Sequence, residues 1–324
     1  MGQLTYLEGF DRNNLNVKMR MALLLIELKK YDKAVIKLEE VLVRAPDSDK
    51  IRFYLGAVHE EMNEKELAAR HYMKVTSASS YYPEAIVHTS YLYKQLGRME
   101  KAVEVMKLGI KKRPEQPQFY AFYASLLDEM KKFPEAVSML KVATKKFPDH
   151  IRLNFFLGSM YDRVGLSDNT IVQMKKVLEL DPDHVQAMNY LAYTYAEKGI
   201  MLDTAESLVR RALELQPNDG FILDTLGWIL FKDGDLKQSL KYLEAAHKLM
   251  GKESIIAEHL GDAYYSLQLV EKAKEMYLRA MRNETDVNKI EKIKNKITAI
   301  RYQRHKRIPA SVRSTDTKKS TNKK

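Results

Sequence analysis

The chain has 324 residues, of which 45% are hydrophobic and 30% charged, so it can bury a core and keep a polar surface. The absence of cysteine excludes a disulfide framework, a thiolate metal site and a cysteine nucleophile. With only 13 glycines and 9 prolines, the sequence argues against a turn-rich all-β fold.

The net charge of +11 is concentrated at the C-terminal end. Residues 301–324 contain nine Lys or Arg and one acid, and residues 287–300 contain four Lys and one Glu. Residues 1–286 are neutral, with 41 bases and 41 acids. The basic end is either a solvated, disordered tail or a segment that attaches to nucleic acid or to an anionic surface.

No apolar run is long enough to span a bilayer, and no signal peptide or lipobox cysteine is visible in the sequence as written. We therefore expect a cytoplasmic location. A periplasmic or outer-membrane-associated location is the alternative if the N-terminus is incomplete.

Comparison of the sequence with itself gives a period of 34 residues. In chain order, residues 1–14 are predicted to be a partial repeat or an N-terminal cap, and residues 288–301 a capping helix. Residues 302–324 are predicted to be a basic disordered tail. Between them lie eight predicted helix–turn–helix units, 15–48, 49–82, 83–116, 117–150, 151–184, 185–219, 220–253 and 254–287.

The eighth position of every unit holds a small residue, and a small side chain allows a second helix to pack closely against the first. These residues are Ala22, Gly56, Ser90, Ala124, Gly158, Ala192, Gly227 and Gly261. Where the first helix must end, Gly97, Gly165, Gly199 and Gly234 suit a left-handed cap. Each helix is only about three turns long and would be marginal alone, so stability must come from neighbouring repeats.

This pattern resembles the tetratricopeptide repeat. The resemblance covers residues 15–287 and implies an all-α fold, a right-handed superhelical solenoid of about eight repeats with a C-terminal capping helix. The stretch from Asn189 to Ala246 also resembles a block common in bacterial proteins of this family. The family implies a non-catalytic scaffold that binds a peptide or a partner protein in a concave groove.

Catalytic and metal-binding signatures are missing from the sequence. No glycine-rich phosphate loop, Gly-x-Ser-x-Gly elbow or His-Glu-x-x-His helix occurs, and no two histidines lie three or four residues apart. We expect no enzyme activity, no cofactor and no metal. His59 occupies a buried-type position and is predicted to be a core residue.

The resemblance also implies which residues face the groove, because first helices line it with their positions two, five, nine and twelve. The expected partner-binding residues are Phe155, Asn189, Tyr193, Asp224, Trp228, Phe231, Asp262 and Tyr265. Aromatic residues are typical interface anchors, although some of these could simply pack against neighbouring first helices.

Trp228 is assigned to the groove because it lies off the apolar stripe of its own helix, formed by Leu223, Leu226 and Leu230. Acids outnumber bases on the predicted groove, so we expect a peptide with an apolar anchor and a Lys or Arg. Binding of nucleic acid or an anionic surface through the basic C-terminal helix and tail is the alternative, and self-association remains open.

Overall fold

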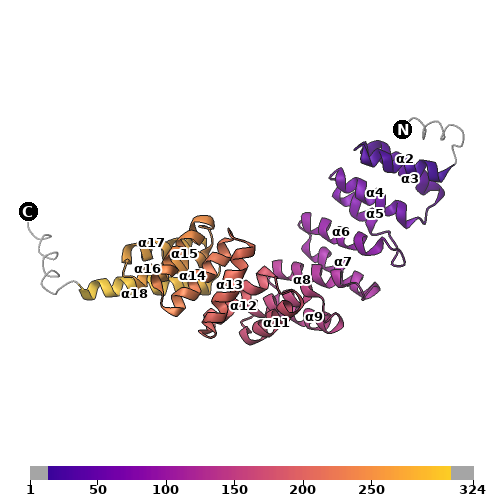
Figure 1. Ribbon diagram of the computed structural model, residues 1–324. Helices are drawn as coiled ribbons and strands as arrows, with labels where there is room; N and C mark the ends of the chain where they lie inside the picture. Colours follow the sequence, from indigo (N-terminus) through magenta and orange to yellow (C-terminus); the bar gives the residue numbers. More distant parts are fainter. Residues whose placement is uncertain (1–13, 308–324) are drawn as a thin grey trace, which may run out of the picture. The chain divides into compact units, whose positions relative to one another are not determined.

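The computed structural model describes residues 14–307 of the chain, and side chains as far as residue 300. Throughout this described part the regular secondary structure is helical (Figure 1). The fold is therefore an all-α solenoid, as the repeat predicted. Its contacts divide the chain into two units, Met1–Leu166 and Ser167–Lys324, and this division falls inside the predicted repeat 151–184.

In the first unit, helices α2 to α10 follow one another in pairs, each packed against the next. The first helices of the pairs are α2 (Leu15–Glu27), α4 (Asp49–Glu61), α6 (Tyr82–Gln95), α8 (Pro117–Glu129) and α10 (Ile151–Arg163). The second helices are α3 (Tyr31–Arg44), α5 (Lys65–Tyr72), α7 (Met99–Lys112) and α9 (Phe133–Lys146).

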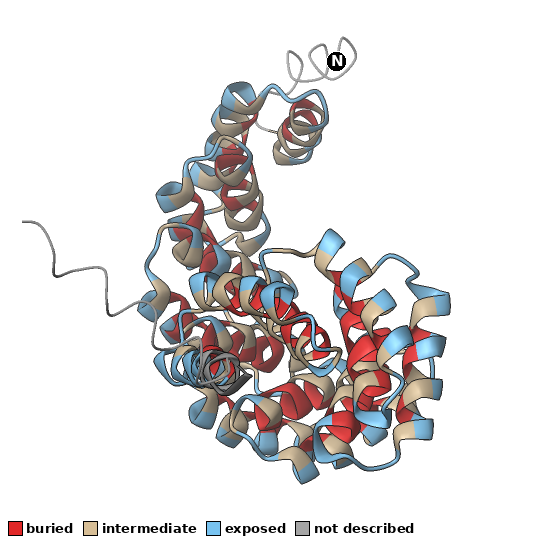
Figure 2. Cartoon of the chain, turned by 90° about the vertical axis from the view of Figure 1, so that its left-hand side faces the viewer, coloured by how far each residue is buried: buried red, intermediate tan, exposed pale blue. Residues whose placement is uncertain are grey.

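The second unit continues the same alternation and ends on a longer helix. It contains α11 (Ser167–Leu180), α12 (Val185–Lys198), α13 (Leu202–Leu215), α14 (Gly220–Asp233), α15 (Leu236–Leu249), α16 (Ser254–Ser266), α17 (Val270–Asn283) and α18 (Val287–Arg307). First helices also touch one another here, α12 with α14 and α14 with α16. Buried residues are concentrated on the sides of the helices that face other helices (Figure 2).

The two ends of the array differ in part from the prediction. Asn14 caps α2 with its side chain, and residues 1–13, predicted to be a partial repeat or cap, lie outside the described residues. Helix α18 continues to Arg307, so the prediction of a disordered tail from residue 302 is wrong for residues 302–307. Residues 301–307 contain no helix breaker, and Pro309 disfavours helix only at the residue before it. Residues 308–324 lie outside the described part.

The turn between paired helices repeats one left-handed backbone position. It falls on the expected Gly97, Gly165, Gly199 and Gly234, and also on Lys29, Asn63, Lys131 and Gln268, all with φ between 54° and 92°. These positions follow one another at intervals of 34 residues, with a single interval of 35 before Gly234. The turn geometry is therefore a property of the repeat, which some copies adopt without glycine.

Because a side chain in this conformation is strained, Lys131→Gly should raise the free energy of unfolding by about 1 kcal/mol. Gly97→Ala is the matched reverse change, since φ at Gly97 is 69° and no neighbour lies near its Cβ position, and it should cost about the same. Urea unfolding of the two variants measures both effects. Equal midpoints for the wild type and the two variants would contradict this account.

The small residue at the eighth position permits the close contact within a pair. A Cβ atom on Gly261 would lie 2.6 Å from the Tyr277 ring, and one on Gly56 would lie 2.6 Å from the Tyr72 ring. In units where the small residue is alanine, as at Ala22 and Ala124, the residue sixteen positions later is leucine. At Gly56 and Gly261 glycine therefore makes room for a tyrosine ring, whereas Gly227 faces Leu243.

We expect Gly261→Ala to destabilise the chain by about 1–3 kcal/mol through overpacking, although alanine is the better helix former. Adding Tyr277→Leu to this variant should recover part of the loss, because the Ala–Leu combination already occurs in other units. Thermal melts of the single and double variants test the pairing. A single variant as stable as the wild type would show that the ring contact does not limit the approach.

Candidate functional site

Seven of the eight predicted groove residues lie on three first helices of the second unit that contact one another in turn. They are Asn189 and Tyr193 on α12, Asp224, Trp228 and Phe231 on α14, and Asp262 and Tyr265 on α16. Phe155 is half-buried on α10 of the first unit, where its ring lies 6.5 Å from that of Phe156. We call the surface formed by the seven residues the inner face.

Trp228 joins the three helices of the inner face. Its ring stacks on His259 of α16 at a centroid distance of 4.0 Å and on Phe231 at 4.9 Å. Its indole N–H donates a hydrogen bond of 2.6 Å to Glu197 of α12. The side chain is only 7% exposed, so Trp228 holds neighbouring repeats together.

Asp224 and His259 form a buried pair between α14 and α16. The two carboxylate oxygens of Asp224 lie 2.9 and 3.1 Å from His259 Nδ1, and the residues are 4% and 3% exposed. Burial by itself would lower the pKa of His259, but the charge and hydrogen bond of Asp224 outweigh it and raise that pKa above its usual value. The carboxylates of Asp262 and Glu197 act in the same direction.

The charge of Asp262 is compensated by the capping helix. Lys296 of α18 donates to both carboxylate oxygens of Asp262 at 2.9 and 2.7 Å, and lies 2.6 Å from Glu258. The Tyr277 hydroxyl donates a third hydrogen bond to Asp262 at 2.6 Å. Burial alone would lower the pKa of Lys296, but the two carboxylates raise it, so the amine stays charged.

The expectation that Trp228 and Asp224 stand open in a groove is therefore wrong. Both are buried, because α14 packs against its own second helix and also against α12 and α16. The prediction that Asp224 and Asp262 make the groove acidic is also wrong, because each carboxylate has a positively charged partner within the chain. Asp224 is matched by His259, and Asp262 is matched by Lys296.

Sequence reasoning missed His259, Glu197 and Lys296, which complete the network. The available signal was spacing, since the partners of Asp224 and Asp262 lie 35 and 34 residues further along, about one repeat away. Phe221 was missed as well. It is 42% exposed and lies three residues before Asp224 and seven before Trp228, on the same face of α14.

His59, predicted to be a core histidine, is 7% exposed, and its Nδ1 lies 2.6 Å from a Glu64 oxygen. Among the residues that the structure describes, no group of three or more His, Asp or Glu side chains could hold a metal ion. None of the helices described is long and apolar enough to cross a membrane.

Paired antiparallel helices repeated along a chain, with a small residue at each close approach, define an α-helical repeat protein. Tetratricopeptide-repeat profiles match three segments, residues 17–48, 83–116 and 174–207. The chain belongs to the tetratricopeptide-repeat family, which is generally a non-catalytic, protein-interaction fold.

Two solved structures share the fold. A tetratricopeptide repeat protein from Parabacteroides merdae aligns with a TM-score of 0.56 and 18% identity, over 68% of this chain and 88% of that one. The APC/C hetero-tetramer Cut9-Hcn1 aligns with a TM-score of 0.53 and 16% identity, over 80% of this chain and 51% of that one.

Among curated proteins, anaphase-promoting complex subunit 3 from Schizosaccharomyces pombe is 34% identical over 62 residues. That match covers 19% of this chain and 9% of the yeast protein.

Trp228 is the only tryptophan of the chain, so its fluorescence reports whether the stacked His259 is protonated. We expect emission to rise with pH, because a protonated imidazole quenches indole more strongly than a neutral one. Since Asp224 favours the charged form, the midpoint should lie above about 6.5, the usual pKa of histidine. Asp224→Asn should lower the midpoint, and His259→Gln should abolish the transition.

The same pair makes stability depend on pH. Between the usual pKa of histidine and the raised pKa, folded His259 holds a proton that the unfolded chain has lost. The stabilisation is therefore complete below about pH 6.5 and is lost as the pH rises through the raised value. A fluorescence midpoint at or below 6.5 in the wild type would contradict this charge assignment.

Proposed function

We propose that this protein is an interaction scaffold whose inner face, on α12, α14 and α16, holds an extended segment of a partner protein. The observation that carries the proposal is an unpaired acceptor on that face. Asn189 Oδ1 is buried, yet it has no hydrogen-bond partner among the described residues.

An unsatisfied buried acceptor costs about 1–3 kcal/mol, so a bound group that donates a hydrogen bond to it would be stabilised by a similar amount. Asn189 lies four residues before Tyr193, which places the two side chains on one face of α12. Once the partly exposed Asn189 side chain turns outward, its oxygen would accept a hydrogen bond from a backbone N–H group of a bound segment. An extended segment presents such groups at regular intervals.

The rest of the inner face supports a segment with apolar side chains. Tyr193, Phe231 and Tyr265 are each half-buried, so part of each ring is open to contact, and Phe221 is exposed on the same side of α14. Aromatic rings of this kind supply contact area at a low cost in conformational entropy.

Because Asp224 and Asp262 have partners within the chain, we no longer expect a peptide that contains a Lys or Arg. With Asp224 and Asp262 engaged within the chain, the inner face offers little attraction to a Lys or Arg. We therefore infer a partner segment of low net charge, held by backbone hydrogen bonds and apolar contacts. Its affinity should depend only weakly on salt.

We expect Asn189→Ala to weaken the binding of peptides selected on the wild-type chain from a random display library. The loss should be about tenfold, the effect of one hydrogen bond worth about 1.4 kcal/mol. The melting temperature should stay unchanged or rise, because the variant removes an unsatisfied polar group. Fluorescence anisotropy of labelled peptides and thermal melts measure the two effects.

Asn154→Ala is the matched control. Asn154 is also a first-helix asparagine, but it is 3% exposed and its amide donates to the backbone oxygens of Pro148 and His150. Its loss should lower the melting temperature and leave peptide affinity unchanged. If the selected peptides bind Asn189→Ala and Phe231→Ala as tightly as the wild type, the inner face is not the binding site.

A second candidate function, attachment to nucleic acid or an anionic surface, is supported by the exposed Lys289 and Lys292 on α18. Lys296 belongs to the same helix but is engaged by Asp262 and Glu258. The basic surface of α18 is thus smaller than the count of its lysines suggests, and the peptide scaffold is the function that the geometry favours.

A further inference from the structure

The C-terminal halves of α7 and α9 carry lysines without any acid. Residues 105–112 and 136–147 contain no Asp or Glu, and every lysine in them is exposed, namely Lys107, Lys111, Lys112, Lys141, Lys145 and Lys146. Of these, only Lys107 has a carboxylate partner among the side chains that the structure describes, that of Glu135 at 3.3 Å. The positive charge on this part of the first unit is largely uncompensated.

An apolar depression lies between the two helices. It has a volume of about 340 Å³ and is lined by residues of α7, α8 and α9, namely Lys107, Ile110, Lys111, Tyr120, Tyr123, Met139 and Val142. Val142 is 64% exposed, although it is an aliphatic residue beside other apolar side chains. Lys107 and Lys111 of α7 therefore lie beside the apolar residues of this depression.

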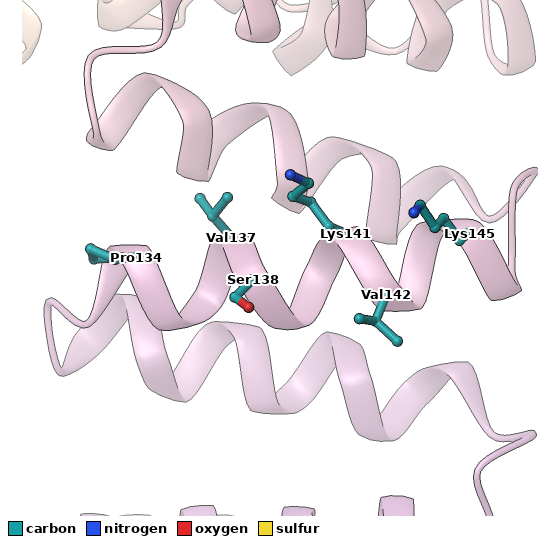
Figure 3. Close-up of a pocket in the computed structure, with 6 residues that line it drawn as sticks. All are labelled: Pro134, Val137, Ser138, Lys141, Val142 and Lys145. Carbon is teal, nitrogen blue, oxygen red and sulfur yellow. The ribbon is translucent and has the colours of Figure 1, made fainter.

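A second depression, of about 370 Å³, lies along α9 itself (Figure 3). Val142 also lines this one, together with Lys141 and Lys145. Figure 3 shows Val142 on the opposite side of α9 from Val137 and Lys141. Val142 lines both depressions, and in the first of them it lies together with Lys107 and Lys111 of α7.

Compensation of the helix dipole accounts for only part of this pattern. A lysine in the last turn of a helix is stabilised by the helix dipole. This explains Lys111 and Lys112 on α7 and Lys145 and Lys146 on α9. Lys107 and Lys141 precede the last turn of their helices, where the dipole has little effect. The helix dipole also does not explain why Val142 is exposed beside Lys107 and Lys111.

We propose that this region, which we call the α7–α9 surface, binds an acidic amphipathic helix of a partner protein. The apolar stripe of that helix lies over Val142, Ile110 and Met139, and its carboxylates face Lys107 and Lys111 of α7. The groove between two neighbouring helices suits a third helix, whose anchors recur at three- and four-residue intervals. The lysines favour an acidic partner and disfavour a basic one.

The test uses two synthetic helical peptides with identical leucine stripes, one with glutamate and one with lysine at all other exposed positions. Fluorescence anisotropy with the full chain should show binding of the glutamate peptide only. Val142→Glu and Lys111→Glu should each weaken that binding by about tenfold. Higher salt should weaken it as well, because exposed charges are screened.

Val43→Glu is the matched control, since Val43 is 82% exposed on α3, whose C-terminal half contains Glu39 and Glu40. It should bind the glutamate peptide like the wild type, and thermal melts should show that all three variants fold. Equal binding of both peptides, or no effect of Val142→Glu, would overturn the proposal. Binding to phosphatidylserine vesicles without binding to the glutamate peptide would overturn it in favour of a lipid surface.

Discussion

The close approach of paired helices at a small residue is the contact on which the rest of this structure depends. At Gly227, a Cβ atom would lie 2.7 Å from the Leu243 side chain and 3.1 Å from the Leu243 backbone nitrogen, so α15 lies directly against α14. Trp228, the next residue, points to another side of α14 and reaches α12 and α16. The contact inside one pair therefore sets where that pair meets its neighbours.

The fold could be predicted from the sequence because one short period repeats along the chain. A small residue every 34 or 35 positions and a turn after each first helix were sufficient to predict an all-α solenoid. The side chains of Lys29, Lys131 and Gln268 give no sign of a left-handed turn, and only their spacing of one or two repeats from Gly97 or Gly234 indicates it. Packing around the turn imposes that conformation in every copy.

The site was harder to predict than the fold, and Trp228 shows the reason. A single apolar stripe identifies the buried side of a helix that packs on one neighbour. Helix α14 packs on four, namely α12, α13, α15 and α16, so residues off the stripe, Asp224 and Trp228 among them, are buried as well. Asn189 lies on α12, and its unpaired oxygen depends on atomic positions that a residue pattern does not contain.

Helix α18 does more than cover the last apolar residues with Ile293, Ile297 and Ile300. Through Lys296 it places one positive charge against Glu258 and Asp262, which belong to a repeat that precedes it. A protease that cut the chain before α18, or an acetyl group on Lys296, would leave both carboxylates uncompensated. The charge that the inner face presents is thus set in part by α18, and it could be changed there without altering a residue of the face itself.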